Sequence, residues 1–148
     1  EVLPGATWWP RLLEDVAAAS RVVVAVYLYD NTSLHELFLQ KLRGRRAFDL
    51  QVTVDKEGFE KRDAPRQRPK LLALKGAGAK VCVASGEGTT GRLHCKAVVL
   101  DRRVAYTGSA NLTEKSESNH ELVCRLQGPP VQAVSEAVAT FCAAAVFI

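Results

Sequence analysis

Apolar residues recur along the chain with two periods, one typical of buried strands and one typical of helices. Residues 21–29 form a continuous Val-rich run, as in a strand buried on both faces, whereas residues 10–20 place Leu12 and Val16 on one face of a helix. The same patterns predict further strands at 49–55, 79–84, 93–101, 104–107 and 121–126, and further helices at 33–44, 69–77 and 131–146. Strands and helices that alternate in this way predict an α/β fold with helical layers on the sheet.

Local signals mark the ends of several elements and the segments between them. Ser33 and Glu36 form a capping box that opens one helix, and Gly44 closes it. The charged segment 56–69 interrupts the apolar pattern, so we expect a mobile loop there. Residues 85–91 are glycine-rich, but they lack the Lys-Ser/Thr ending of a nucleotide P-loop and precede a strand, which excludes nucleotide binding of that kind.

The length of the chain allows one domain. A chain of 148 residues with 47% hydrophobic content can bury one substantial core, and a second catalytic domain does not fit. We therefore expect residues 1–148 to form a single domain.

Two features have both a structural and a functional interpretation. The formal net charge is only +4, yet basic residues concentrate at 41–46 and 60–70, where they form either solvated loops or a surface for an anionic partner. Trp8 and Trp9 either pack in the core or lie exposed, where they stack on nucleic-acid bases or sit in a lipid interface. We favour packing, because aromatic side chains bury large areas.

The cysteines give no sign of a metal site. Cys82, Cys95, Cys124 and Cys142 form no C-x-x-C pair and no zinc-ligand spacing with the three histidines, so we expect reduced, mostly buried thiols. The chain begins at Glu1 and contains no methionine, so we expect a piece of a longer protein that lacks any targeting peptide or membrane anchor. The sequence identifies no compartment; we expect a soluble domain and favour an intracellular one.

The densest group of reactive side chains begins at His94. Side chains two apart on a strand point to the same face, so His94 and Lys96 project together while Cys95 projects away. An imidazole can attack phosphorus, and an adjacent ammonium can neutralise the phosphate oxygens. The pair predicts phosphoryl-transfer chemistry that requires neither a metal nor another cofactor.

The residues that follow extend this pair into a longer motif. His94-x-Lys96, Asp101 and Gly108-Ser109-x-Asn111 resemble the signature of the phospholipase D superfamily, and Asn119-x-Glu121 resembles its second element. The resemblance implies a single α/β domain with a mixed β-sheet flanked by helices on both faces. It is greatest to the short, single-motif members, which include bacterial nucleases and the mitochondrial cardiolipin hydrolase, or Zucchini, type. The chain lacks the cysteine-rich zinc-binding insertion of the latter.

The resemblance also implies a role for each motif residue. His94 is expected to form a covalent phosphohistidine, while Lys96 and Asn111 bind the phosphate oxygens of the substrate. Ser109 and Glu121 are the candidates for orienting a histidine ring.

Asp101 and Asn119 are expected to support the site, Asp101 as a structural hydrogen-bond acceptor. His35 is expected on a helix surface, and His120 is expected to be the variable middle residue of Asn119-x-Glu121, so neither is expected to be catalytic. Because the family mechanism uses two histidines and one chain supplies one motif, the resemblance implies a homodimer with a shared site.

The motif does not choose the substrate, because phosphodiesters occur in lipids and in nucleic acids. The first expectation is a phospholipase that releases phosphatidic acid from anionic phospholipids, which needs an apolar surface beside His94. The alternative is an endonuclease on single-stranded nucleic acid, in which the two basic runs follow the backbone. A third interpretation, of another class, is a non-catalytic scaffold that binds phosphate.

Overall fold

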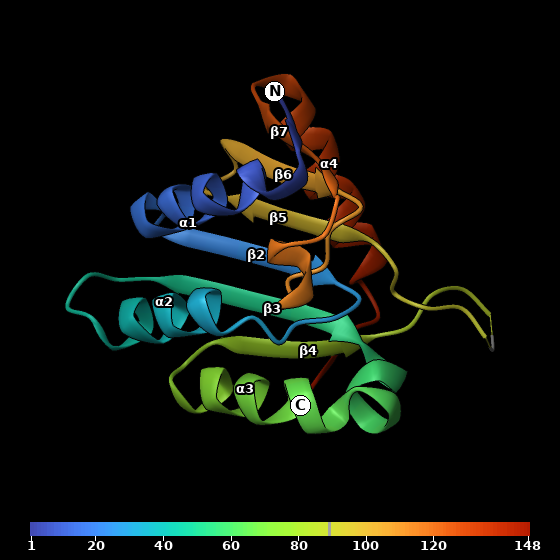
Figure 1. Ribbon diagram of the computed structural model, residues 1–148. Helices are drawn as coiled ribbons and strands as arrows, with labels where there is room; N and C mark the ends of the chain where they lie inside the picture. The colour runs from blue at the N-terminus through green and yellow to red at the C-terminus, as the bar shows by residue number, and fades with distance from the viewer. Residues whose placement is uncertain (89) are drawn as a thin grey trace.

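The computed structural model describes residues 1–88 and 90–148, and at its centre lies an eight-stranded β-sheet (Figure 1). The strands have the spatial order β1-β7-β6-β5-β2-β3-β4-β8. In chain order their bounds are β1 Val2–Pro4, β2 Arg21–Val26, β3 Asp49–Asp55, β4 Lys80–Ala84, β5 Lys96–Leu100, β6 Val104–Gly108, β7 Leu122–Gln127 and β8 Val146–Phe147. Each apolar run that predicted a strand contributes to this sheet.

The sheet joins a parallel half to an antiparallel half. β2, β3 and β4 pair in parallel, whereas β5, β6, β7 and β1 each pair antiparallel with their neighbours. At the junction β2 and β5 are antiparallel, with Val26 opposite Lys96. The carboxyl ends of β2, β3 and β4 therefore lie at the same edge of the sheet as the amino ends of β5 and β7 and the carboxyl end of β6.

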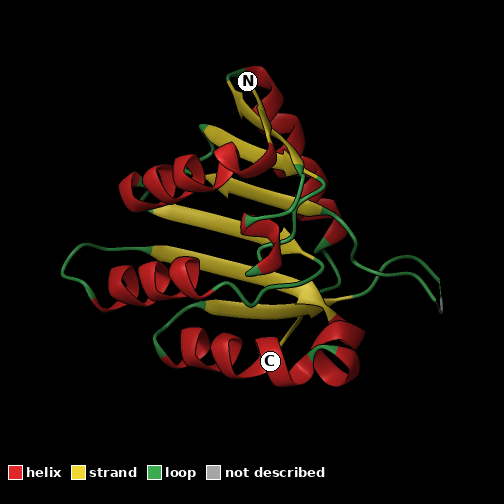
Figure 2. Ribbon diagram, in the orientation of Figure 1, coloured by secondary structure: helices red, strands yellow, loops and turns green. Residues whose placement is uncertain are grey.

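Helices cover both faces of the sheet, as Figure 2 shows. α1 (Trp8–Ala18), α2 (Thr32–Arg43) and α3 (Ala64–Gly76) lie on one face, and α4 (Pro129–Phe141) lies on the other. The alternation along β2 matches these layers, because Val22, Val24 and Val26 join the large core under the first three helices while Val23 and Ala25 pack with residues of α4. The predicted mixed sheet with helices on both faces is confirmed.

The segment 56–69 is not the loop that its charges predicted. It contains the π-helical turn η2 (Gly58–Arg62) and the first turns of α3. Gln67 and Leu71 are buried on the inner side of α3, and Pro65 stands in the first helical turn, where its missing N–H costs no hydrogen bond. Packing against the sheet therefore outweighs the polar composition of this segment.

Two other helix ends differ from the prediction. α2 begins after Asn31, whose Oδ1 accepts from the Leu34 amide at 2.9 Å, so Asn31 and not Ser33 caps the helix. α4 ends at Phe141 and not at residue 146, because the following residues turn back and form the edge strand β8 beside β4. Among residues 1–88 and 90–148, no helix has both the length and the apolar character needed to cross a membrane.

Short 3-10 turns lie before α1 and before β7, at η1 (Gly5–Thr7) and η3 (Lys115–Glu117). Trp8 and Trp9 are buried in the core, which confirms the packing interpretation. The prediction for His35 is wrong: its side chain is buried, and its Nδ1 lies 3.3 Å from the Tyr29 hydroxyl. Burial lowers the pKa of His35, so its neutral form is favoured there.

The four cysteines are free thiols. Cys82 is buried, but Cys95, Cys124 and Cys142 are only half-buried, so the thiols are more accessible than the apolar runs predicted. Burial raises the pKa of Cys82, Cys95 and Cys142, which favours the protonated, less reactive form.

An ion pair between the buried Arg125 and the partly buried Asp15 ties α1 to the antiparallel half of the sheet. The Asp15 carboxylate accepts from Arg125 Nε at 2.7 Å and from the Tyr106 hydroxyl. Burial alone raises the pKa of Asp15, but hydrogen bonds from Arg125 and Tyr106 outweigh it, and the pKa lies below its usual value. A depressed carboxylate pKa stabilises the fold at neutral pH, and this contribution is lost as the pH falls through the depressed value.

We expect Asp15→Ala to lower the free energy of unfolding by about 3 kcal/mol at neutral pH, because Arg125 is left buried without its partner. Urea denaturation measures this change, and the difference from wild type should shrink in acid. Glu14→Ala is the control, since the Glu14 side chain is 70% exposed and its pair with Arg11 is a surface one. Equal stabilities of the two variants would contradict the assigned role.

Candidate active site

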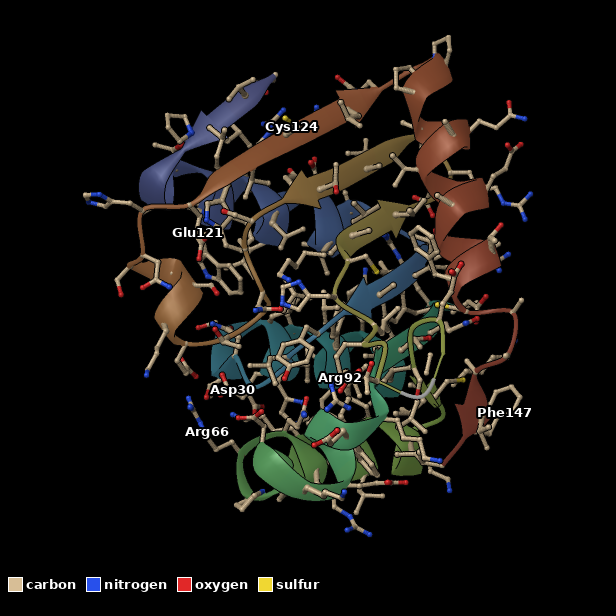
Figure 3. All side chains as sticks on the ribbon, turned by 90° about the vertical axis from the view of Figure 1, so that its right-hand side faces the viewer. Asp30, Arg66, Arg92, Glu121, Cys124 and Phe147 are labelled. Carbon is tan, nitrogen blue, oxygen red and sulfur yellow. The ribbon has the colours of Figure 1, made fainter. Side chains whose placement is uncertain are left out.

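The motif side chains other than Asp101 gather at the edge of the sheet where the parallel strands end. Figure 3 views this edge, the right-hand side of Figure 1, and places Glu121, Arg92, Asp30 and Arg66 around it. The site is therefore assembled from the ends of several strands, as is usual for ligand sites in α/β sheets.

His94 lies two residues before β5 and not within a strand, because β5 begins at Lys96. The two side chains nevertheless meet. Lys96 Nζ lies 3.2 Å from His94 Nδ1 and 3.4 Å from Nε2, and it donates to the His94 carbonyl oxygen at 2.7 Å. Lys96 thus fixes both the backbone and the ring of His94 at the entrance to the strand.

A tyrosine that the sequence did not single out borders the pair. The Tyr27 ring centroid lies 5.0 Å from that of His94, and Lys96 Nζ lies 6.0 Å from the Tyr27 centroid. Burial lowers the pKa of Lys96, against the opposing effects of Cys95 and Glu121. The position of Tyr27, directly after the end of β2, is the signal that could have found it.

Ser109 and Glu121 form a second group that bridges β6 and β7. The Ser109 hydroxyl donates to Glu121 Oε2 and accepts from the Leu122 amide at 3.0 Å. Asn119 Nδ2 donates to Glu121 Oε1 at 3.3 Å. Both carboxylate oxygens of Glu121 are thereby oriented, and among the described residues neither Ser109 nor Glu121 hydrogen-bonds to His94 within the chain.

Asn111 and Asp101 are held at opposite ends of the sheet. Asn111 Oδ1 accepts from the Leu28 amide at 3.2 Å, so its Nδ2 amide is the group that can donate to a ligand. Asp101 follows the far end of β5, where its Oδ1 accepts from the Arg21 amide at 2.8 Å and from the Ser20 amide at 3.0 Å. Asp101 therefore lies outside the group around His94 and joins the β5–β6 turn to β2.

Asp55, which the sequence analysis missed, holds the segment that leads into His94. Its side chain is 1% exposed, and its two oxygens accept from the Leu93 and Gly58 amides, each at 3.0 Å. Asp55 is the last residue of β3, so its bond to the Leu93 amide anchors the segment that crosses the ends of β3 and β2 on its way from β4 to β5. An acidic residue at the end of an apolar strand is the sequence signal for such a role.

The arginines at the rim of this edge are paired with carboxylates. Arg66 binds Asp30 at 2.7 Å, and Arg92 pairs with Glu57. The glycine-rich loop 85–91 begins beside this rim, where Ser85 pairs with Arg92. Thr89 of that loop lies outside the described residues.

Comparison with known families decides the classification. The family described as "Cardiolipin synthase, PLD-like domain" matches residues 14–143, most of the chain. The chain belongs to the phospholipase D superfamily. It carries the phosphodiesterase fold of that superfamily, as the motif around His94 predicted.

Solved structures share this phospholipase D fold. NucT from Helicobacter pylori matches with a TM-score of 0.83 at 16% identity, over 100% of this chain and 98% of NucT. Nuc from Salmonella typhimurium, a phospholipase D family member, matches with a TM-score of 0.83 at 15% identity, over 100% and 97%. TrmBL2, an archaeal chromatin protein, matches with a TM-score of 0.70 at 12% identity, over 100% of this chain and 54% of its own. No curated protein matches the chain.

We expect Asp55→Ala to lower the free energy of unfolding by about 2 kcal/mol, because two buried amides lose their acceptor. In the variant, hydrogen exchange at the Leu93 amide should be faster than in the wild type, while exchange at amides of the central strands changes less. Asp49→Ala at the exposed start of the same strand is the control. Unchanged protection of Leu93 would show that Asp55 does not hold this segment.

Proposed function

We propose that the protein is a metal-independent phosphodiesterase in which His94 is the nucleophile. The observation that carries the proposal is the contact of Lys96 Nζ with the His94 ring, because a phosphate attacked by that ring meets the ammonium at the same point. Asn111 adds an amide donor whose orientation is set by Leu28. Tyr27 supports the ring from the side.

The reaction has two displacement steps. In the first, a His94 nitrogen forms a bond to phosphorus, the P–O bond to the leaving group breaks, and the departing oxygen takes a proton from an acid. In the second, water attacks phosphorus, gives its proton to the same group acting as base, and the P–N bond breaks to release a phosphomonoester and free His94. The mechanism therefore needs an acid–base group besides His94.

We propose that His94 of a second copy supplies that group in a two-fold homodimer. The other histidines of the chain are poorly placed for it. His35 is buried against Tyr29, and His120 makes no contact with His94 among the described residues. In such a dimer the oriented Glu121 and Ser109 are the candidates for holding a histidine ring across the interface.

For the substrate we place single-stranded nucleic acid ahead of phospholipid. Of the exposed large apolar side chains among the described residues, only Leu122 comes from a segment next to the site, whereas a phospholipase needs an apolar surface for acyl chains. The other exposed ones are Val2, Leu72, Phe141, Val146 and Phe147. TrmBL2, whose structure is described as showing a mode of DNA binding, shares this fold.

We expect the protein, with chelator present, to cleave bis(p-nitrophenyl) phosphate and a single-stranded oligonucleotide, and to cleave anionic phospholipid vesicles slowly or not at all. His94→Ala should lower kcat at least about 10³-fold, because the covalent step is lost. His120→Ala, which changes the nearby exposed histidine, should leave kcat unchanged. Cleavage of the vesicles without cleavage of the oligonucleotide would show that phospholipid, not nucleic acid, is the preferred substrate. Loss of activity with chelator, or none on any substrate, would contradict the proposal.

The shared site predicts how mixed dimers behave. When wild type and His94→Ala are combined in equal amounts and allowed to exchange subunits, only about one quarter of the dimers keep two His94 side chains. Activity per wild-type chain should therefore fall to about half. Activity per wild-type chain that stays constant on mixing would show that each chain works alone.

A further inference from the structure

The basic run at 41–46 lies far from His94. It begins in the last turn of α2 and leads toward the amino end of β3, at the left of Figure 1, whereas the site lies at the opposite edge of the sheet. Five residues of β5 separate Lys96 from the turn at Asp101, a rise of about 17 Å. Within a single chain this run therefore does not lie beside His94.

Instead, this run joins other basic residues at the amino ends of β2 and β3. Two hollows meet at Ser20, one bordered by Lys41, Arg45 and Arg46 and the other by Arg21, Arg102 and Arg103. We call these six basic residues the amino-end surface. With the carboxylates of Asp49 and Asp101 its net charge is +4, equal to that of the whole chain, so the remainder of the chain is neutral overall.

The two carboxylates leave most of this positive charge unpaired. Asp49 pairs with Arg21 at 3.3 Å on the surface, and Asp101 is occupied by the amides of Ser20 and Arg21. Lys41 Nζ donates to the Ala17 carbonyl oxygen at 2.8 Å. Arg45, Arg46, Arg102 and Arg103 form no ion pair with any carboxylate in the described part of the chain. The arginines of the active-site rim, by contrast, are paired with acids.

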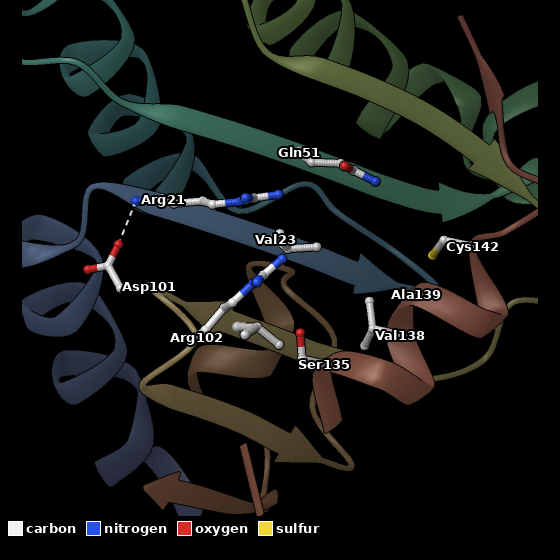
Figure 4. A pocket seen from close by; sticks show the side chains of 10 residues that line it. Arg21, Val23, Gln51, Asp101, Arg102, Ser135, Val138, Ala139 and Cys142 are labelled. Atoms are coloured by element: carbon white, nitrogen blue, oxygen red, sulfur yellow. Dashed lines mark hydrogen bonds between the residues drawn. The ribbon is translucent and has the colours of Figure 1, made fainter. Parts of the chain in front are cut away.

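The amino-end surface also opens into a cavity between the sheet and α4. Figure 4 shows Arg21 and Arg102 extending over the strands toward this cavity, which has a volume of about 150 Å³. Gln51 and Ser135 supply polar groups to its wall. The rest of the wall is largely apolar, so the groups suited to phosphate oxygens are the two guanidiniums that line the cavity, since each can bind through two parallel donors.

The backbone places Arg102 there in a conformation that arginine does not favour. Asp101 and Arg102 have φ values of 51° and 57°, and the Arg103 amide donates to the Leu100 carbonyl oxygen at 2.9 Å, which is a type I′ turn. Glycine is the preferred residue at such positions. Arg102→Gly therefore removes the charge and relaxes the turn at the same time.

We propose that the amino-end surface is a second, non-catalytic site that binds the phosphate backbone of single-stranded nucleic acid. The inference rests on the proposed function for its substrate class. It adds that nucleotides away from the cleaved phosphodiester bind to the amino-end surface. A nucleic acid fits better than a membrane for two reasons. The surface is built mainly from arginines over a concavity, and none of the exposed large apolar side chains comes from residues 20–21, 41–49 or 101–103.

The test is binding of a labelled single-stranded oligonucleotide of about 20 nucleotides, followed by fluorescence anisotropy over a range of salt concentrations. Arg45→Gln/Arg46→Gln should weaken binding about tenfold and lower the slope of log affinity against log salt by about 1.4, and Arg102→Gly should lower it by about 0.7. Arg11→Gln, an exposed arginine on α1, is the single-charge control and should bind as wild type. Cleavage of bis(p-nitrophenyl) phosphate should be unchanged in all variants, which also shows that they are folded.

The outcomes separate this inference from the proposed function. Wild-type binding by both the double variant and Arg102→Gly would overturn the inference and leave the function standing. If these variants bind the oligonucleotide more weakly but the wild type does not cleave it, the proposed substrate is contradicted and the amino-end surface is supported as a binding site. If the variants lose binding to phosphatidylserine vesicles but bind the oligonucleotide as the wild type does, the surface is a membrane contact and the inference is overturned.

Discussion

The antiparallel pairing of β2 with β5, which sets Val26 opposite Lys96, determines where every reactive group of this protein lies. It joins a parallel half of the sheet to an antiparallel half, so that strand ends of both halves meet at one edge. Lys96 enters that edge from β5, Tyr27 from β2, Asp55 from β3, and Ser109 and Glu121 from the ends of β6 and β7. A slip of one residue in this register would turn Lys96 from the face covered by α1, α2 and α3 to the α4 face.

The two ends of the sheet differ in how their charges are balanced. At the active-site edge, Asp30 pairs with Arg66 and Glu57 with Arg92, whereas Lys96 has no acidic partner among the described residues and contacts His94. At the amino end, Arg21 pairs with Asp49, but Arg45, Arg46, Arg102 and Arg103 have no acidic partner within the part of the chain that the structure describes. In the account proposed here, the first arrangement favours one phosphate held at a defined point, and the second favours a backbone held loosely along a surface.

Much of the fold could be predicted from local patterns. The apolar run at 49–55 forms β3 with the expected bounds, and the alternation from 93 onward brings His94 and Lys96 together even though His94 precedes the strand. The rest depends on contacts between distant segments. Asp55 reaches the Leu93 amide 38 residues later, and β8 forms because β4 offers an edge to residues 146–147. No periodicity within a short window contains these contacts, so the sequence alone misses them.

The most direct test of the covalent mechanism is to trap the intermediate. The protein would be mixed with a phosphodiester substrate, quenched with base, in which phosphohistidine survives, and examined by mass spectrometry of its peptides. We expect one phosphoryl-containing adduct, on His94, that disappears in His94→Ala. An adduct on another residue, or turnover of the substrate by the wild type with no adduct formed on a rapid-quench time scale, would contradict it.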